Sequence, residues 1–138
     1  MTVSCMDPRV IPEELCGLSA GQIPVIRCAG GRAQLAVNDI AVLNALIGIS
    51  EIVLIHHQDC GLMHKTDEQL RQKVTSLSVS AASNINFDGL AIDDLRQSLK
   101  HDIAWLSQHP LIKHETIITG LAYDIDTGAL ERVDSDLL

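Results

Sequence analysis

The chain has 138 residues, of which 46% are hydrophobic and only 2% aromatic, and its formal net charge is -8. This length favours a single domain over residues 1–138 with an aliphatic core. The acidic balance disfavours nucleic acid and anionic membranes as partners, because both require basic patches.

The cellular compartment is predicted from two sequence features, the N-terminal residues and the length of the apolar runs. The chain opens without the charged and apolar regions of a signal peptide, and no apolar run reaches the ~18 residues of a membrane span. We therefore expect a cytoplasmic protein. Cysteines in that compartment are more often free thiols or metal ligands than disulfides, which applies to Cys5, Cys16, Cys28 and Cys60.

Apolar runs alternate with amphipathic segments along the chain, which predicts an α/β fold. In chain order we expect a strand at 1–5, a helix at 10–18, a strand at 23–28, a helix at 35–47, a strand at 51–56, a helix at 67–74, a long surface loop at 75–87, a helix at 92–107, a strand at 115–123 and a returning strand at 129–133. The result is a mostly parallel central sheet flanked by helices, with an antiparallel hairpin at the C-terminus.

The strand expected at 51–56 runs directly into His57 and, after two spacers, Cys60. Ligand sites of open α/β sheets gather at the carboxyl ends of strands. Imidazole and thiolate are zinc ligands, although this pair alone is more often a part of a protein core.

The first strand also ends in a cysteine, Cys5. Neighbouring parallel strands would bring it beside His57 and Cys60. Two thiolates and one imidazole leave a fourth position open, as in catalytic rather than structural zinc sites. A structural site would need a fourth ligand, for which the candidates are Cys16, Cys28 and His64.

Asp7 and Arg9 follow Cys5 at alternate positions, where their side chains can meet. An arginine beside a carboxylate lowers the carboxyl pKa and fixes its orientation. Such an aspartate can accept the hydrogen bond of a metal-bound water, whereas the pair in isolation would be an ordinary ion pair.

Three motifs together resemble the β-class carbonic anhydrases, in particular the small, minimal branch that includes carbonyl sulfide hydrolase-like members. They are Cys-x-Asp-x-Arg at Cys5, Asp7 and Arg9, Arg-x-Ala-Gly-Gly at Arg27, Ala29, Gly30 and Gly31, and His-x-x-Cys-Gly at His57, Cys60 and Gly61. The order and approximate spacing match the family over most of the chain. One departure is Cys28, which stands where the family usually has Asn.

The resemblance implies one Zn²⁺ per chain, with Cys5, His57 and Cys60 as ligands and Asp7 and Arg9 as the catalytic pair. It also implies a homodimer or homotetramer with its active site at the subunit interface. The implied reaction is the reversible hydration of carbon dioxide to bicarbonate by a zinc-bound hydroxide. The residues expected around the substrate are Cys28, Ala29, Gly30 and Gly61.

Two alternatives stay open at this point. One is hydrolysis of carbonyl sulfide or carbon disulfide to carbon dioxide and hydrogen sulfide on the same zinc site. The other is a non-catalytic zinc or redox sensor, which four cysteines permit. If the site is catalytic, two thiolates would leave the zinc less polarising than a tri-histidine site does, which predicts activity that rises toward alkaline pH.

Overall fold

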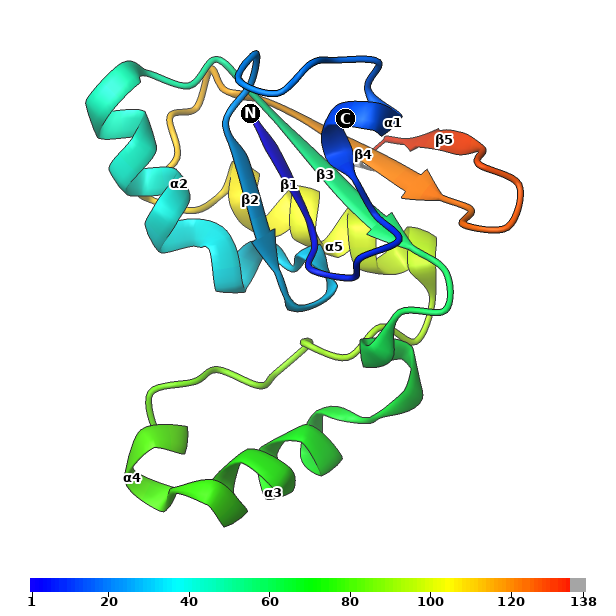
Figure 1. The fold of residues 1–138 in the computed structure, drawn as a ribbon. Coiled ribbons are helices and arrows are strands. Elements are labelled where there is room, and N and C mark those ends of the chain that lie inside the picture. The colour runs from blue at the N-terminus through cyan, green and yellow to red at the C-terminus, as the bar shows by residue number, and fades with distance from the viewer. Residues whose placement is uncertain (135–138) are drawn as a thin grey trace.

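The computed structural model describes residues 1–134, which contain a five-stranded sheet with the order β2-β1-β3-β4-β5 (Figure 1). The strands are β1 (Thr2–Cys5), β2 (Val25–Cys28), β3 (Glu51–His57), β4 (Ile117–Tyr123) and β5 (Leu130–Val133). All neighbouring strands are parallel except β4 and β5, which form an antiparallel pair. The predicted α/β fold is confirmed.

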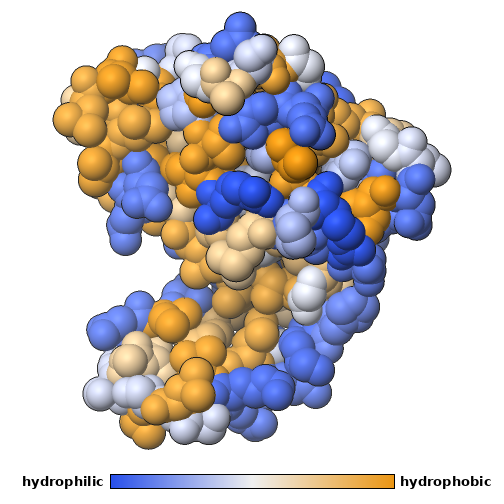
Figure 2. Space-filling view, viewed as in Figure 1, coloured by the Kyte–Doolittle hydropathy of each residue, from blue (hydrophilic) through white to orange (hydrophobic). Residues whose placement is uncertain are grey.

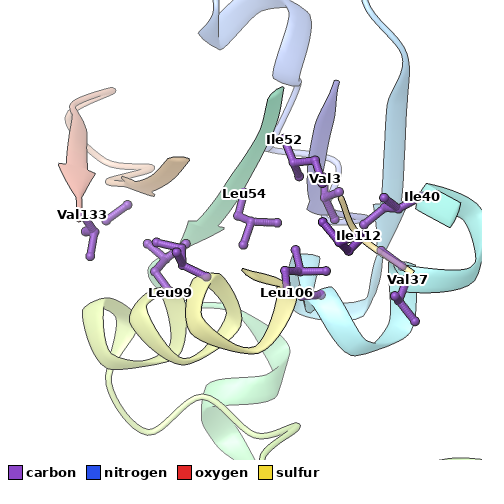
Figure 3. Packing of buried hydrophobic residues seen from close by; sticks show 13 residues of the cluster. Val3, Val37, Ile40, Ile52, Leu54, Leu99, Leu106, Ile112 and Val133 are labelled. Atoms are coloured by element: carbon purple, nitrogen blue, oxygen red, sulfur yellow. The ribbon is translucent and has the colours of Figure 1, made fainter. Parts of the chain in front are cut away.

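Helices cover both faces of this sheet (Figure 1). The long helices α2 (Ala33–Ile47) and α5 (Leu95–Ser107) lie on one face and form the main core with it, whereas the short helix α1 (Pro12–Leu15) lies on the other. In Figure 3, Leu54 of β3 points toward Leu99 and Leu106 of α5. The core is aliphatic, as the composition indicates.

Strand β3 is buried on both sides, which explains its unbroken apolar run. Side chains alternate along a strand, so Ile52 and Leu54 belong to the main core. Val53 and Ile55 instead pack with Val10 on the side of α1. The strand thereby carries the residues that follow it on a rigid support.

Two local predictions are wrong in extent. The helix expected at 10–18 is only the single turn of α1, because Gly17, two residues after its end, adopts a left-handed conformation (φ 65°). The loop expected at 75–87 contains helix: α3 (Asp67–Leu77) runs into it, and α4 (Val79–Ala82) follows. Serine is typical of loops, but the Ser78 hydroxyl caps α4 by accepting from the backbone N–H of Ala81.

Helices α3 and α4 form an arm that stands away from the sheet (Figure 1). The Asp67 carboxylate accepts hydrogen bonds from the backbone N–H groups of Gly89 and Ala91, which ties the arm to the returning chain. Figure 2 shows a hollow between arm and body with apolar side chains along its inner wall. Within residues 1–134, no helix has the length and apolar character needed to cross a bilayer.

Candidate metal centre

Three residues with metal-binding side chains meet at the C-terminal edge of the sheet. Cys5 ends β1, His57 ends β3, and Cys60 lies in the loop that follows. Their ligand atoms all lie within 4.8 Å of one another, and the three residues are buried. The two sulfurs are 3.9 Å apart, close to the ~3.8 Å that two zinc–sulfur bonds of about 2.3 Å span at a tetrahedral angle.

The His57 ring is oriented as a ligand through Nε2. Its Nδ1 lies 2.8 Å from the carbonyl oxygen of Gln58, which assigns the ring proton to Nδ1. Nε2 is buried and has no hydrogen-bond partner among residues 1–134. An orphaned buried nitrogen requires an explanation, and a metal ion held beside the two sulfurs provides one.

The thiols of Cys5 and Cys60 are in hydrogen-bonding contact. This contact is the main cause that holds the pKa of Cys5 well below its usual range, against the opposing effect of burial. The same contact raises the pKa of Cys60. A metal ion binding here must therefore displace the Cys60 proton.

Asp7 and Arg9 pair beside the centre. Arg9 donates from Nε to Asp7 Oδ1 (3.0 Å) and from Nη2 to Asp7 Oδ2 (2.8 Å). These bonds hold the pKa of the Asp7 carboxyl well below its usual range, so the group is an acceptor at neutral pH. Oδ2 of Asp7 lies 4.0 Å from Nε2 of His57, which places the carboxylate next to the candidate metal position.

The loop that carries Asp7 is fixed by Arg27 of β2. Its guanidinium donates to the backbone carbonyls of Cys5 (3.2 Å), Asp7 (2.6 Å) and Val10 (2.8 Å). One side chain therefore satisfies three carbonyls of an irregular segment and holds it against the sheet.

The backbone of the turn η1 (Ala29–Gly31) packs closely against the backbone of β1 and β3. Gly31 has φ 68°, and a Cβ built there would lie 2.8 Å from the carbonyl oxygen of Ile55. Both the conformation and the space require glycine.

A pocket of about 310 Å³ opens onto the centre. Its lining consists of Cys5, Met6, Asp7, Pro8, Ala29, Gly30, Cys60, Gly61 and Leu62. The lining includes three of the four residues predicted around the substrate. The fourth, Cys28, is paired with Cys5 in the sheet but is not part of this lining. Its thiol donates to the Arg32 carbonyl (3.5 Å) and packs against the main core, and burial raises its pKa to about 12.

Comparison with known proteins agrees with this geometry. A family model described as carbonic anhydrase matches residues 1–130. The chain is 30% identical over 135 residues to beta-carbonic anhydrase 1 of Mycobacterium tuberculosis, with 95% of this chain and 79% of that protein covered. The chain belongs to the β-carbonic anhydrase family.

Two further similar proteins are a carbonic anhydrase and a carbon disulfide hydrolase. A solved carbonic anhydrase from Glaciozyma antarctica superimposes with a TM-score of 0.84 at 35% identity, covering 96% of this chain and 80% of that one. Carbon disulfide hydrolase of an Acidianus species is 26% identical over 154 residues, covering 94% of this chain and 74% of that protein.

Sequence reasoning missed a buried ion pair between Arg32 and Asp102. Arg32 Nη2 lies 2.7 Å from Asp102 Oδ1, and both side chains are 2% exposed. Arg32 Nη1 also donates to the carbonyls of Leu90 (3.2 Å) and Ala91 (3.0 Å), in the segment that returns from the arm. The partners are too far apart in the chain for any local pattern to join them.

His56 belongs to the same buried network rather than to the metal centre. Its Nδ1 lies 2.8 Å from Ser98 Oγ, and its Nε2 lies 3.4 Å from Asp102 Oδ2. It therefore points away from His57, toward α5, as expected for the adjacent residue of a strand.

Asp59 was also missed. Its carboxylate and its carbonyl both accept hydrogen bonds from Arg9. The signal available was its position, a carboxylate immediately before Cys60 in a loop at the end of a buried strand.

Proposed function

We propose that the protein is a zinc enzyme that catalyses the reversible hydration of carbon dioxide to bicarbonate, with residues 1–138 acting as one domain. The observation that carries the proposal is the trio of Cys5, His57 and Cys60. Within residues 1–134, no fourth His, Cys, Asp or Glu joins this group, and three protein ligands are typical of catalytic zinc. Membership of the β-carbonic anhydrase family supports the choice of reaction.

The residues around the trio have separate roles. Zinc with three protein ligands supplies Lewis-acid activation of water. Asp7, kept ionised and oriented by Arg9, would offer Oδ2 as a hydrogen-bond acceptor to the attacking water and so orient that water toward the substrate. The apolar part of the pocket, which includes Met6 and Leu62, suits a small uncharged substrate.

Hydrolysis of carbon disulfide or carbonyl sulfide is the second candidate. It is supported by the similarity to the Acidianus carbon disulfide hydrolase over 94% of this chain and by the apolar pocket wall. The ligand trio and the Asp7–Arg9 pair would serve both reactions, because each begins with the attack of oxygen on an electrophilic carbon.

The deciding experiment is a side-by-side assay of the zinc-loaded protein on the three substrates, following proton release from carbon dioxide and sulfide release from the other two. We expect turnover of carbon dioxide. Sulfide release without carbon dioxide hydration would support the second candidate. Turnover of none of them at full zinc content would refute both and favour a non-catalytic zinc or redox sensor.

Three variants link the activity to the residues. Asp7→Asn should keep stoichiometric zinc and lose about 10²–10⁴-fold in kcat. Cys60→Ser should lose the metal. Cys16→Ser is the matched control, because Cys16 is half-buried at the end of α1 and packs in a separate cluster, and it should keep both zinc and activity. Full activity in Asp7→Asn would remove Asp7 from the mechanism.

We also propose a homodimer or homotetramer. Val42, Leu46 and Ile47 of α2 are 62%, 75% and 62% exposed, and Figure 2 shows apolar surface over this part of the molecule. Burial of such a patch would favour self-association. Light scattering at micromolar concentration should give a mass of two or four chains, and a strictly monomeric protein would contradict the proposal.

A further inference from the structure

Asp59 adopts a backbone conformation that nothing in its immediate sequence requires. Within residues 1–134 it is the only residue other than glycine with a positive φ, 53°. Such conformations are uncommon for residues with a side chain, and they persist where the surrounding contacts hold them. The contacts of Asp59 are therefore the place to look for its role.

Those contacts lead to Arg9. Arg9 Nη1 donates to Asp59 Oδ2 (2.9 Å), and Arg9 Nη2 donates to the Asp59 carbonyl oxygen (3.1 Å). The left-handed turn at Asp59 thus presents a side-chain acceptor and a backbone acceptor to one guanidinium. The other carboxylate oxygen, Oδ1, lies 3.2 Å from Nε2 of the exposed His64.

The same guanidinium holds Asp7. Its Nε and Nη2 donate to the two carboxylate oxygens of Asp7. The Arg9 guanidinium therefore bridges Asp59 and Asp7. A guanidinium is planar and its donors are fixed relative to one another. Any contact that fixes the plane of Arg9 therefore also fixes the direction in which Asp7 faces the His57 nitrogen, 4.0 Å from its Oδ2.

Stabilisation of the fold does not account for this arrangement. The side chains of Arg9 and Asp59 are 46% and 58% exposed, and ion pairs so exposed contribute little to stability. Half-exposed Arg9 could otherwise turn into solvent and release Asp7. What the Asp59 contacts do is restrict orientation.

We propose that Asp59 is a positioning residue, which holds Arg9 in the plane that orients Asp7 toward the metal centre. The inference rests on the proposed function in one respect, since the orientation of Asp7 affects turnover only if the centre is catalytic. It goes further by adding a second carboxylate-bearing residue, outside the Asp7–Arg9 pair, that acts through Arg9.

The test compares kinetics of zinc-loaded variants. Asp59→Gly removes the carboxylate and tolerates the positive φ, Asp59→Ala removes it without that tolerance, and Asp59→Asn keeps an acceptor. We expect kcat of Asp59→Gly to fall at least about tenfold with KM changed less than about threefold, as for an interaction made in the transition state. Asp59→Asn should recover most of the loss.

The matched control is Asp88→Gly. Asp88, in the segment after α4, accepts from Arg71 of α3 in an exposed ion pair (2.8 Å), so this pair resembles the Asp59 pair in exposure but not in location. It should leave kcat and KM unchanged. A double variant, Arg9→Ala with Asp59→Gly, should lose no more activity than Arg9→Ala alone, because Asp59 acts only through Arg9.

A readout independent of turnover completes the test. In ¹⁵N NMR spectra, the Arg9 guanidinium should rotate slowly in the wild type and in Asp59→Asn. It should rotate faster in Asp59→Gly, which loses the bond to Nη1 but keeps the contacts with Asp7 and with the backbone carbonyl of residue 59. Zinc content should be the same in all three proteins.

Several results would overturn the inference. These are a kcat of Asp59→Gly within twofold of wild type, additive losses in the double variant, loss of zinc from Asp59→Gly, and unchanged Arg9 signals. If the wild type turns over none of the substrates, the proposed function fails, and the NMR comparison alone decides whether Asp59 positions Arg9.

Discussion

Removal of the Asp102 carboxylate should destabilise the protein strongly. It accepts hydrogen bonds from Arg32 Nε (3.0 Å), Arg32 Nη2 (2.7 Å) and the backbone N–H of Ala33 at the start of α2 (2.8 Å). In Asp102→Ala, a guanidinium that is 2% exposed would keep its charge without a counterion. Loss of one partner of a buried pair costs about 3–5 kcal/mol.

That cost converts into a measurable shift of the thermal midpoint. With an unfolding entropy of about 2.1 cal/mol/K per residue over 138 residues, the expected fall in Tm is about 10–17 °C. The measurement is thermal unfolding followed by circular dichroism at pH 7, on zinc-loaded and metal-free protein. A fall of less than about 3 °C would refute the assignment of Arg32 and Asp102 as a buried, mutually dependent pair.

Two comparisons isolate the cause. Glu131→Ala removes an exposed pair with Arg96 and should shift Tm by less than about 3 °C. The double variant Arg32→Met with Asp102→Leu removes both buried charges and should recover part of the loss.

The pH dependence has a definite sign. Burial alone would raise the pKa of Asp102, but His56 and Arg32 outweigh it, so the folded pKa lies below the unfolded value. The carboxylate therefore contributes stability above about pH 4, the ordinary range of an aspartate, and loses it as the pH falls toward the folded pKa. The difference between wild type and Asp102→Ala should shrink only in that acidic window.

Other outcomes follow from the site and its support. Gly31→Ala should lower Tm and soluble yield because its Cβ would meet the Ile55 carbonyl, whereas Gly61→Ala, with open space around it, should leave stability unchanged; equal stabilities would contradict the close approach. Zinc affinity, measured by chelator competition, should rise from pH 6 to 8.5 because the raised pKa of Cys60 lets protons compete with the metal; a constant affinity would count against a raised pKa of Cys60. Turnover should likewise rise toward alkaline pH, since two thiolates weaken the activation of water; a flat profile would argue against it.

Much of this molecule could be predicted from local pattern. The four residues 52–55 of β3 are all apolar because both faces of the strand are covered there. The helix at 35–47 keeps its period within a single segment. Cys5 and His57 could be placed together because carboxyl ends of parallel strands meet at one edge. Each of these inferences uses only neighbours in sequence or a general rule of sheets.

The contacts that orient the site could not be predicted in this way. Arg32 precedes α2 and Asp102 lies in α5, so the two residues are far apart in the sequence. Nothing in the sequence near either residue indicates that they form a pair. Asp59 reads as an ordinary loop residue until its positive φ and its contacts with Arg9 are seen. The prediction of a loop at 75–87 was wrong for a different reason. A serine hydroxyl can hydrogen-bond to the backbone in a loop and can equally cap a helix, so serine content does not distinguish the two.

The register of the sheet has a consequence for how the protein acquires its metal. Ser4 of β1 lies opposite Ile55 of β3, so the ligand trio exists only after the crossover through α2 has brought these strands together. A nascent chain in which Cys60 has not yet been synthesised has no such centre. Zinc would thus bind after the slow, non-local pairing of β1 with β3, and it would protect the assembled sheet by slowing its unfolding rather than by speeding its formation.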